Sequence, residues 1–245
     1  MAAETLAIQK RRMWIVTQVA PYSHGPAGVH RVLAQANTAL SELALIEGFD
    51  PCCVSDVTTI NPSEFEAGGI LALFTIGETP FSTVQRTAIF SSWRSSNLGV
   101  LGIHSATDAC HNWPDYATIM GARFIEHPWT QSFPIETVNR EHPCALNLPK
   151  IWNWQDELYV FSALSKNAHI LLQTSPNNFD PQIAGTVGDR EVFPLSWYIA
   201  DPGITFYTSL GHFPEAWEST QYLQYIRGGI QWIRESLNSR NSISA

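Results

Sequence analysis

The sequence predicts an α/β fold built on a parallel sheet, and three observations lead to this prediction. In residues 1–100, short apolar runs of strand length alternate with longer segments of helical periodicity. Glycine or proline follows the first expected strand and the first expected helix, as is typical where such elements end. Of 245 residues, 44% are hydrophobic and 15% are charged, which is enough apolar material for a core. Strands and helices in alternation are characteristic of parallel sheets.

The elements expected in this part of the chain follow one another in a simple order. Residues 13–19 (MWIVTQV) form a first buried strand, and a loop with Pro21, Gly25, Pro26 and Gly28 follows it. Val29 to Ile46 has apolar residues at helical spacing and ends before Gly48. Further strands are expected at 52–54, 70–74 and 100–103, and a helix at 83–93.

The second part of the chain has a less regular pattern. After Asp108 it is rich in Trp, His and Pro without clean periodicity, which indicates loops around a site. Strands are expected at 170–172 and 204–207, and a closing helix at 220–237. We expect one domain over residues 1–245, with frayed ends at about 1–11 and 239–245.

Composition and charge argue against several classes of protein. The net charge is −8 and no Lys/Arg cluster is dense enough for a phosphate backbone, so nucleic acid is not an expected partner. No window approaches the ~18 apolar residues of a membrane-spanning helix. Lys10, Arg11 and Arg12 precede an apolar run that is too short for a signal peptide, so a cytoplasmic location is expected. The four cysteines lack disulfide or CxxC spacing and are expected to be reduced.

Several motifs occur together in one order. From Gly99 to Phe161 the chain contains GIHSATDA, a W-x-x-Y segment, GARFIEHP, a second HP and WQDELY. Further on, it contains Pro194-x-x-Trp197, FYTSLGH at 206–212 and GIQW at 229–232. In these blocks the sequence resembles the ThuA-like (trehalose utilisation) family. His24 also lies where members of that family commonly carry a histidine.

The resemblance implies a fold like that of class I glutamine amidotransferases: a doubly wound, flavodoxin-like, mostly parallel sheet with helices on both faces. Its site would lie at the carboxyl ends of the strands. An amidotransferase has a cysteine nucleophile at a sharp turn, but His104 occupies that turn here and Cys110 comes six residues later. His212 is also one residue further from Glu215 than the amidotransferase His-Pro-Glu spacing allows. Glutamine hydrolysis is therefore not expected.

Four residues are candidates for catalysis: His104, Asp108, Glu157 and His212. Val100–Ile103 should be a buried strand with His104 at its carboxyl end, and His212 should face it, because strand ends in a parallel sheet converge. Asp108 could orient an imidazole or cap the next helix. For the pair Asp156-Glu157, one carboxylate could face the site, and the resemblance favours Glu157.

Seven further residues are candidates for substrate binding, and each also has a structural interpretation. Aromatic rings stack on the C–H faces of sugars, but they are also common core residues. A lone histidine often only binds a loop carbonyl, yet at least two of His104, His127, His142 and His212 are expected in one pocket. The seven are His24, Ser105, Trp113, Tyr116, His127, His142 and Trp197.

Three functions stay open at this point. The first is an enzyme that acts on a sugar or oxidised (keto) sugar by His/Asp/Glu acid-base chemistry. The second is a version dependent on a divalent metal such as zinc, although no HxH or HExxH spacing supports it. The third is a non-catalytic sugar-binding or regulatory module. A nicotinamide cofactor is not expected, because no G-x-G-x-x-G turn follows the first strand. A separate oxidoreductase partner and a homo-oligomer both remain open.

Overall fold

One mixed sheet of nine strands organises the part of the chain that is described. The structure is a computed structural model, and it describes residues 10–17, 32–180 and 190–243. The strand order is β2-β1-β3-β4-β9-β8-β7-β5-β6. The strands are β1 (Arg12–Val16), β2 (Asp50–Val54), β3 (Gly69–Leu73), β4 (Leu98–Ile103), β5 (Phe124–Thr137), β6 (Ile151–Phe161), β7 (Ala168–Thr174), β8 (Phe193–Ile199) and β9 (Ile204–Thr208).

The sheet has a parallel half and an antiparallel half. From β2 to β9 all neighbouring strands are parallel, and from β9 to β6 all are antiparallel. Strands β3, β4 and β9 are buried along their whole length, which explains the continuous apolar runs of β3 and β4. In β6, by contrast, exposed and partly buried residues alternate over its first half. The two halves meet at β9.

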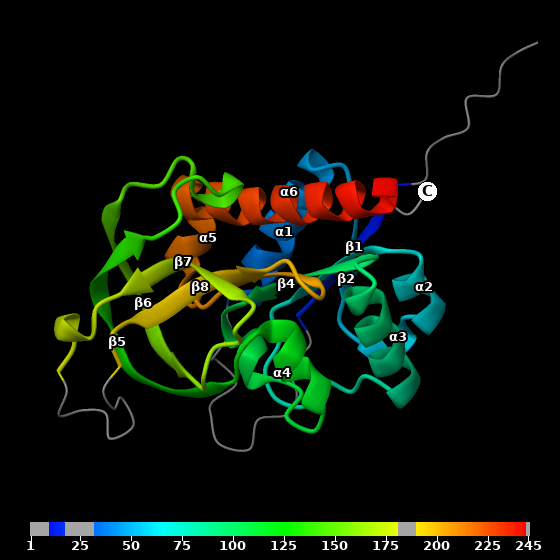
Figure 1. Cartoon of the computed structure of the whole chain (residues 1–245), viewed down its shortest axis with the longest axis horizontal. Helices are drawn as coiled ribbons and strands as arrows, with labels where there is room; N and C mark the ends of the chain where they lie inside the picture. The colour runs from blue at the N-terminus through cyan, green and yellow to red at the C-terminus, as the bar shows by residue number, and fades with distance from the viewer. Residues whose placement is uncertain (1–9, 18–31, 181–189, 244–245) are drawn as a thin grey trace, which may run out of the picture.

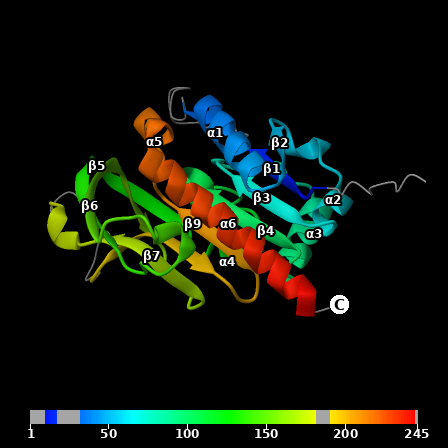
Figure 2. The same ribbon diagram turned by 90° about the horizontal axis from the view of Figure 1, so that it is seen from above.

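Helices cover both faces of the sheet, as Figure 1 shows. Helices α1 (Leu33–Ile46), α5 (Pro214–Glu218) and α6 (Thr220–Ile243) lie on one face, and Figure 2 shows α6 running across that face. Helices α2 (Pro62–Glu66), α3 (Thr83–Arg94) and α4 (Pro114–Met120) lie on the other. No helix within the described ranges is both long enough and apolar enough to span a membrane.

Local sequence signals set several of these helix ends. The side chain of Ser82 accepts a hydrogen bond from the backbone N–H of Gln85, whose side chain binds back to the Ser82 N–H, so α3 begins with a capping box. Asn61 and Glu64 do the same for α2. Gly121 ends α4 with φ = +90°, a conformation that favours glycine.

Successive residues of each central strand point to opposite faces and so divide the core in two. Met13 and Ile15 of β1 pack in the core beneath α1 and α6, whereas Trp14 and Val16 pack in the core beneath α3 and α4. Both cores are fully buried, which fixes the register of the central strands.

Most of the expected elements are present, and the α/β fold with helices on both faces is confirmed. Three expectations differ from the structure. The stretch after Asp108, expected to form loops, contains the long hairpin β5–β6. The sequence did not predict it, because Pro, His and Trp residues hide the alternation typical of strands. The antiparallel strands from β8 to β6 make the sheet mixed where a mostly parallel one was expected. The closing helix, expected over 220–237, also extends to Ile243.

Candidate functional site

His104 directly follows the central strand β4 at a sharp turn of the chain. Its φ of +48° lies in the left-handed region, which residues other than glycine seldom adopt. The 3₁₀ helix η2 (His104–Asp108) begins at this residue. The side chain is fully buried. The predicted strand at Val100–Ile103 and the position of His104 at its carboxyl end are thus confirmed.

Two hydrogen bonds hold His104 in one orientation. The Tyr207 hydroxyl donates to the His104 carbonyl oxygen over 2.7 Å. The imidazole Nδ1 lies 2.7 Å from the Ser209 carbonyl oxygen. Because a carbonyl can only accept, Nδ1 carries the proton in this contact and Nε2 presents its lone pair to the other side of the ring.

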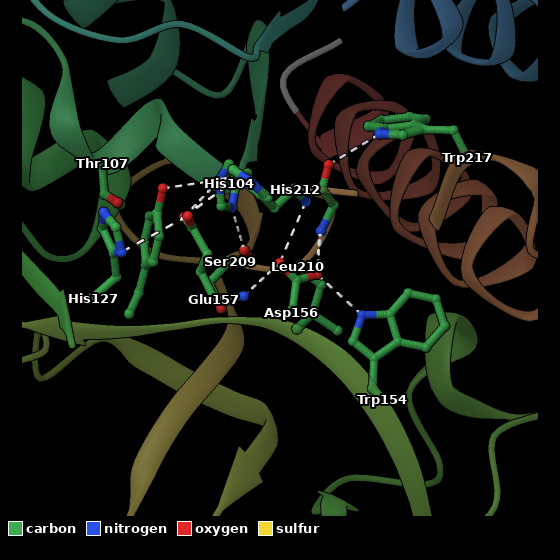
Figure 3. Close-up of polar contacts among 12 residues, drawn as sticks. His104, Thr107, His127, Trp154, Asp156, Glu157, Ser209, Leu210, His212 and Trp217 are labelled. Carbon is green, nitrogen blue, oxygen red and sulfur yellow. Dashed lines mark hydrogen bonds and ion pairs between the residues drawn. The ribbon is translucent and has the colours of Figure 1, made fainter. Parts of the chain in front are cut away.

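His212 and Glu157 converge on this Nε2 atom, as Figure 3 shows. His104 Nε2 lies 3.1 Å from His212 Nδ1 and 3.5 Å from Glu157 Oε2. His212 Nδ1 lies 3.4 Å from the same carboxylate oxygen. The prediction that His104 and His212 face one another is confirmed. Each of the three side chains also offers one atom that could ligate a metal ion, and those atoms lie within 4.8 Å of one another.

Tyr159 and His127 extend the cluster toward the surface. The Tyr159 hydroxyl lies 3.0 Å from His104 Nε2, and the centroids of the two rings are 4.6 Å apart. His127 is half-exposed, and its Nδ1 lies 3.7 Å from Glu157 Oε1. Sequence reasoning missed Tyr159. It could have been found from its position two residues after Glu157, because residues two apart on a strand have their side chains on the same face.

Asp156 fixes the loop that carries His212. It is fully buried, and its Oδ2 accepts from the Gly211 N–H (2.8 Å) and the Trp154 indole N–H (3.0 Å). Its Oδ1 accepts from the Glu157 N–H (2.9 Å) and, more weakly, from the His212 N–H (3.4 Å). The two neighbouring acids therefore divide their roles: Asp156 supports the backbone and Glu157 faces the histidines.

Burial and charge shift the pKa values of these groups in different directions. Burial would raise the pKa of Glu157, but the hydrogen bond and charge of His104, with the charges of His212 and His127, lower it on balance. Burial and the neighbouring His104 lower the pKa of His212. Burial raises the pKa of Asp156, although the charge of His104 and the N–H groups that donate to Asp156 act to lower it. At neutral pH the site thus holds a carboxylate beside a neutral His212 imidazole.

Comparison with known proteins assigns the chain to a family. The family model ThuA, described as trehalose utilisation, matches residues 19–233. The chain belongs to the ThuA family. None of the curated proteins compared with it matches. This membership supports a role related to carbohydrates.

Solved structures show the same fold. A putative ThuA-like protein from Bacteroides uniformis superposes with a TM-score of 0.72 at 20% identity, covering 95% of each chain. Another, from Parabacteroides merdae, gives 0.68 at 16% identity, covering 91% of this chain and 89% of that one. A putative GMP synthase component from Thermoplasma acidophilum gives 0.53 at 14% identity, covering 96% of this chain and 98% of that one. The chain thus has an amidotransferase-like fold.

The aromatic residues expected to bind substrate lie in the core of this ThuA domain. Trp113, Tyr116 and Trp197 are all buried. The Tyr116 hydroxyl donates to the Ala106 carbonyl, and the Trp197 indole N–H donates to the Met120 carbonyl. Their rings have no exposed face on which a sugar could stack, so the structural interpretation holds for them.

Two other predicted residues, His142 and Asp108, have partners outside the cluster of His104, Glu157 and His212. His142 is buried against Tyr198 and Trp232 and contacts Cys144, on the face covered by α6, so it is not part of the cluster. Asp108 pairs with the exposed His111 over 3.0 Å.

Ser105 is fully buried beside His104 in η2. His24 falls outside the described residues. Of the four histidines singled out in the sequence, His104, His127 and His212 share one site.

No thiol stands at the turn where an amidotransferase carries its nucleophile. Cys110 is fully buried, and burial raises its pKa to about 11, so it is a protonated, unreactive thiol at neutral pH. Glu215 lies in the first turn of α5 and is exposed. The residues at this site suit proton transfer or metal ligation in place of thiolate attack.

Proposed function

We propose that this chain is an enzyme of carbohydrate metabolism that acts on a sugar or an oxidised (keto) sugar through His104, Glu157 and His212. The observation that carries the proposal is the convergence of two imidazoles and a carboxylate at the carboxyl end of β4. That edge is where open α/β sheets bind their ligands. The family's description as trehalose utilisation supports a carbohydrate as the ligand.

The geometry supports acid-base chemistry at a hydroxyl or carbonyl group. Because Nδ1 donates to Ser209, Nε2 is the His104 atom that can accept a proton, within reach of His212 and Tyr159. Glu157, whose pKa is lowered, is ionised and can accept a proton or stabilise positive charge on either ring. The half-exposed His127 ring, stacked against Tyr159, provides a flat surface at the outer side of the cluster. If the substrate is a keto-sugar, a separate oxidoreductase must supply it.

Turnover of a sugar panel tests this proposal. The purified chain would be incubated with mono- and disaccharides and their keto derivatives, and products would be followed by NMR. Glu157→Gln and His212→Ala should lower kcat/KM by about 10²–10⁴-fold, the usual contribution of an acid-base group. His169→Gln changes an exposed histidine on β7 and should leave kcat/KM within about twofold.

Two results would argue against an enzyme of this kind. Unchanged turnover in both Glu157→Gln and His212→Ala would remove the cluster from the chemistry. Saturable sugar binding with no turnover on any member of the panel would instead favour the non-catalytic binding module.

A further inference from the structure

We propose that His104, Glu157 and His212 bind one divalent transition-metal ion of the zinc type, with a fourth position left open. The inference rests on the proposed function only in taking a sugar oxygen as the fourth ligand. The ion site itself rests on the positions of three side-chain atoms: His104 Nε2, His212 Nδ1 and Glu157 Oε2.

The spacing of these atoms matches one face of a tetrahedral zinc site. With metal–ligand distances of about 2.0–2.1 Å, two ligands of a tetrahedral ion lie about 3.3–3.4 Å apart. The three pairs here are separated by 3.1, 3.5 and 3.4 Å. An ion equidistant from all three atoms would therefore have normal bond lengths without any movement of the backbone.

The surroundings of His104 Nε2 give a second, independent argument. This atom belongs to a fully buried ring and carries a lone pair, because the ring proton is on Nδ1, which donates to the Ser209 carbonyl oxygen. Yet the Tyr159 hydroxyl, His212 Nδ1 and Glu157 Oε2 all lie within 3.5 Å of it. The Tyr159 hydroxyl can donate to this lone pair, but the ionised Glu157 oxygen is itself an acceptor, so two acceptor atoms face one another. A cation at the centre would accept this lone pair together with those of His212 and Glu157.

The groups behind the three ligands are of the kind that support metal sites. Ligating histidines usually donate their second ring N–H to a carbonyl or carboxylate, which fixes the tautomer and the ring orientation. His104 has this contact with Ser209. Asp156 holds the backbone of Gly211 and His212, so the second imidazole also comes from a fixed loop. His127 lies beside the other oxygen of Glu157.

The donor set selects the class of ion. Two imidazoles and one carboxylate suit zinc and related transition metals, whereas Mg²⁺ and Ca²⁺ prefer oxygen ligands throughout. Two histidines and a glutamate with an open position are also a known catalytic zinc arrangement. At such a position a cation polarises a bound hydroxyl or carbonyl oxygen. Proton transfer would then fall to Glu157 Oε1 and His127.

Metal titration of the full chain tests the proposal without any assay of activity. The chelator-treated protein would be titrated with Zn²⁺ by calorimetry and with Co²⁺ by visible absorption, which reports tetrahedral coordination. One equivalent should bind to the wild type. Glu157→Gln and His212→Ala should each weaken binding by at least about 100-fold, because a ligand contributes more than the 10–100-fold typical of its supporting groups.

Matched controls separate this site from adventitious binding. Cys53 is exposed and could bind zinc on its own, so each titration would be repeated in a Cys53→Ser background. His111→Ala removes a second histidine–carboxylate pair, with Asp108, and should leave affinity within about twofold. His104→Ala empties a fully buried position, and circular dichroism would check its fold. Glu157 and His212 are partly exposed, so their variants keep the test valid.

The outcomes distinguish this inference from the proposed function. Absence of stoichiometric binding in the wild type, or equal affinity in Glu157→Gln and His212→Ala, overturns the metal site. Sugar turnover by fully chelated protein overturns the sugar oxygen as fourth ligand of the ion and leaves the proposed enzyme intact. Stoichiometric zinc that is lost in both variants supports the metal site, even if no sugar in the panel is turned over.

Discussion

Asp156 should be a position at which a small polar substitution lowers stability. Its two oxygens accept four N–H groups in a fully buried setting, from Gly211, Trp154, Glu157 and His212. In Asp156→Asn, the amide oxygen can serve only one pair of donors, and its NH₂ group faces the other pair. If the oxygen turns to Gly211 and Trp154, one good and one weak donor lose their acceptor.

The magnitude follows from these contacts. A buried donor left without a partner costs about 1–3 kcal/mol, and the donor at 3.4 Å contributes less than the one at 2.9 Å. Asp156→Asn should therefore lower the free energy of unfolding by about 2–4 kcal/mol. For a chain of this size that shifts the Tm by roughly 2–4 °C per kcal/mol, or about 4–16 °C in total.

Thermal and urea unfolding of Asp156→Asn would measure this loss. Asp108→Asn is the matched control, because Asp108 pairs with an exposed histidine and its change should remain within about 1 kcal/mol. A Tm for Asp156→Asn within 2 °C of the wild type would show that the carboxylate does not hold the His212 loop, and the assigned roles of the two acids would be wrong.

Three further outcomes are expected. His142 has its pKa lowered to about 4 by burial, against 6.5 when unfolded, so its neutral form stabilises the fold above pH 6.5 and this contribution is lost as pH falls toward 4. After allowance for solvent screening the loss is about 1–2 kcal/mol, and His142→Gln should flatten the pH dependence of urea unfolding over that range. Gly121→Ala should cost about 2–4 kcal/mol in the same assay, from its φ of +90° and a Cβ only 2.7 Å from the Trp197 indole nitrogen; a loss below 1 kcal/mol would contradict this packing. Cys110 should react with a thiol reagent only on unfolding, whereas Cys53 should react in the native chain, as mass spectrometry of labelled peptides would show.

The parallel half of the fold could be predicted because its signals are local. Strands such as β3 and β4 are buried on both faces, so each appears in the sequence as an unbroken apolar run between turn residues. The hairpin β5–β6 could not be found in this way. Pro128 and Pro134 lie within β5, and proline normally argues against a strand. That hairpin forms because of its long-range pairing, which no local pattern shows.

The candidate site was predictable where it depends on topology and was not where it depends on packing. His104 and His212 each follow an apolar strand, and β4 and β9 are neighbours, so their meeting follows from the parallel sheet. Whether Trp113 and Trp197 are buried depends on which other elements pack against them. Because the sequence does not show this, core tryptophans were taken as candidates for sugar stacking.

The pairing of β4 with β9 also has a consequence for how the protein is made. Leu101 of β4 pairs with Phe206 of β9. At typical ribosomal rates, β9 is synthesised roughly 5–20 s after β4, and the two strands cannot pair before then. Until then, β4 presents an open edge in a strand that is apolar throughout, which is a template for aggregation. The nascent chain should therefore depend on chaperones during this interval. Any ligand or ion that needs both His104 and His212 can bind only after release of that last strand from the ribosome.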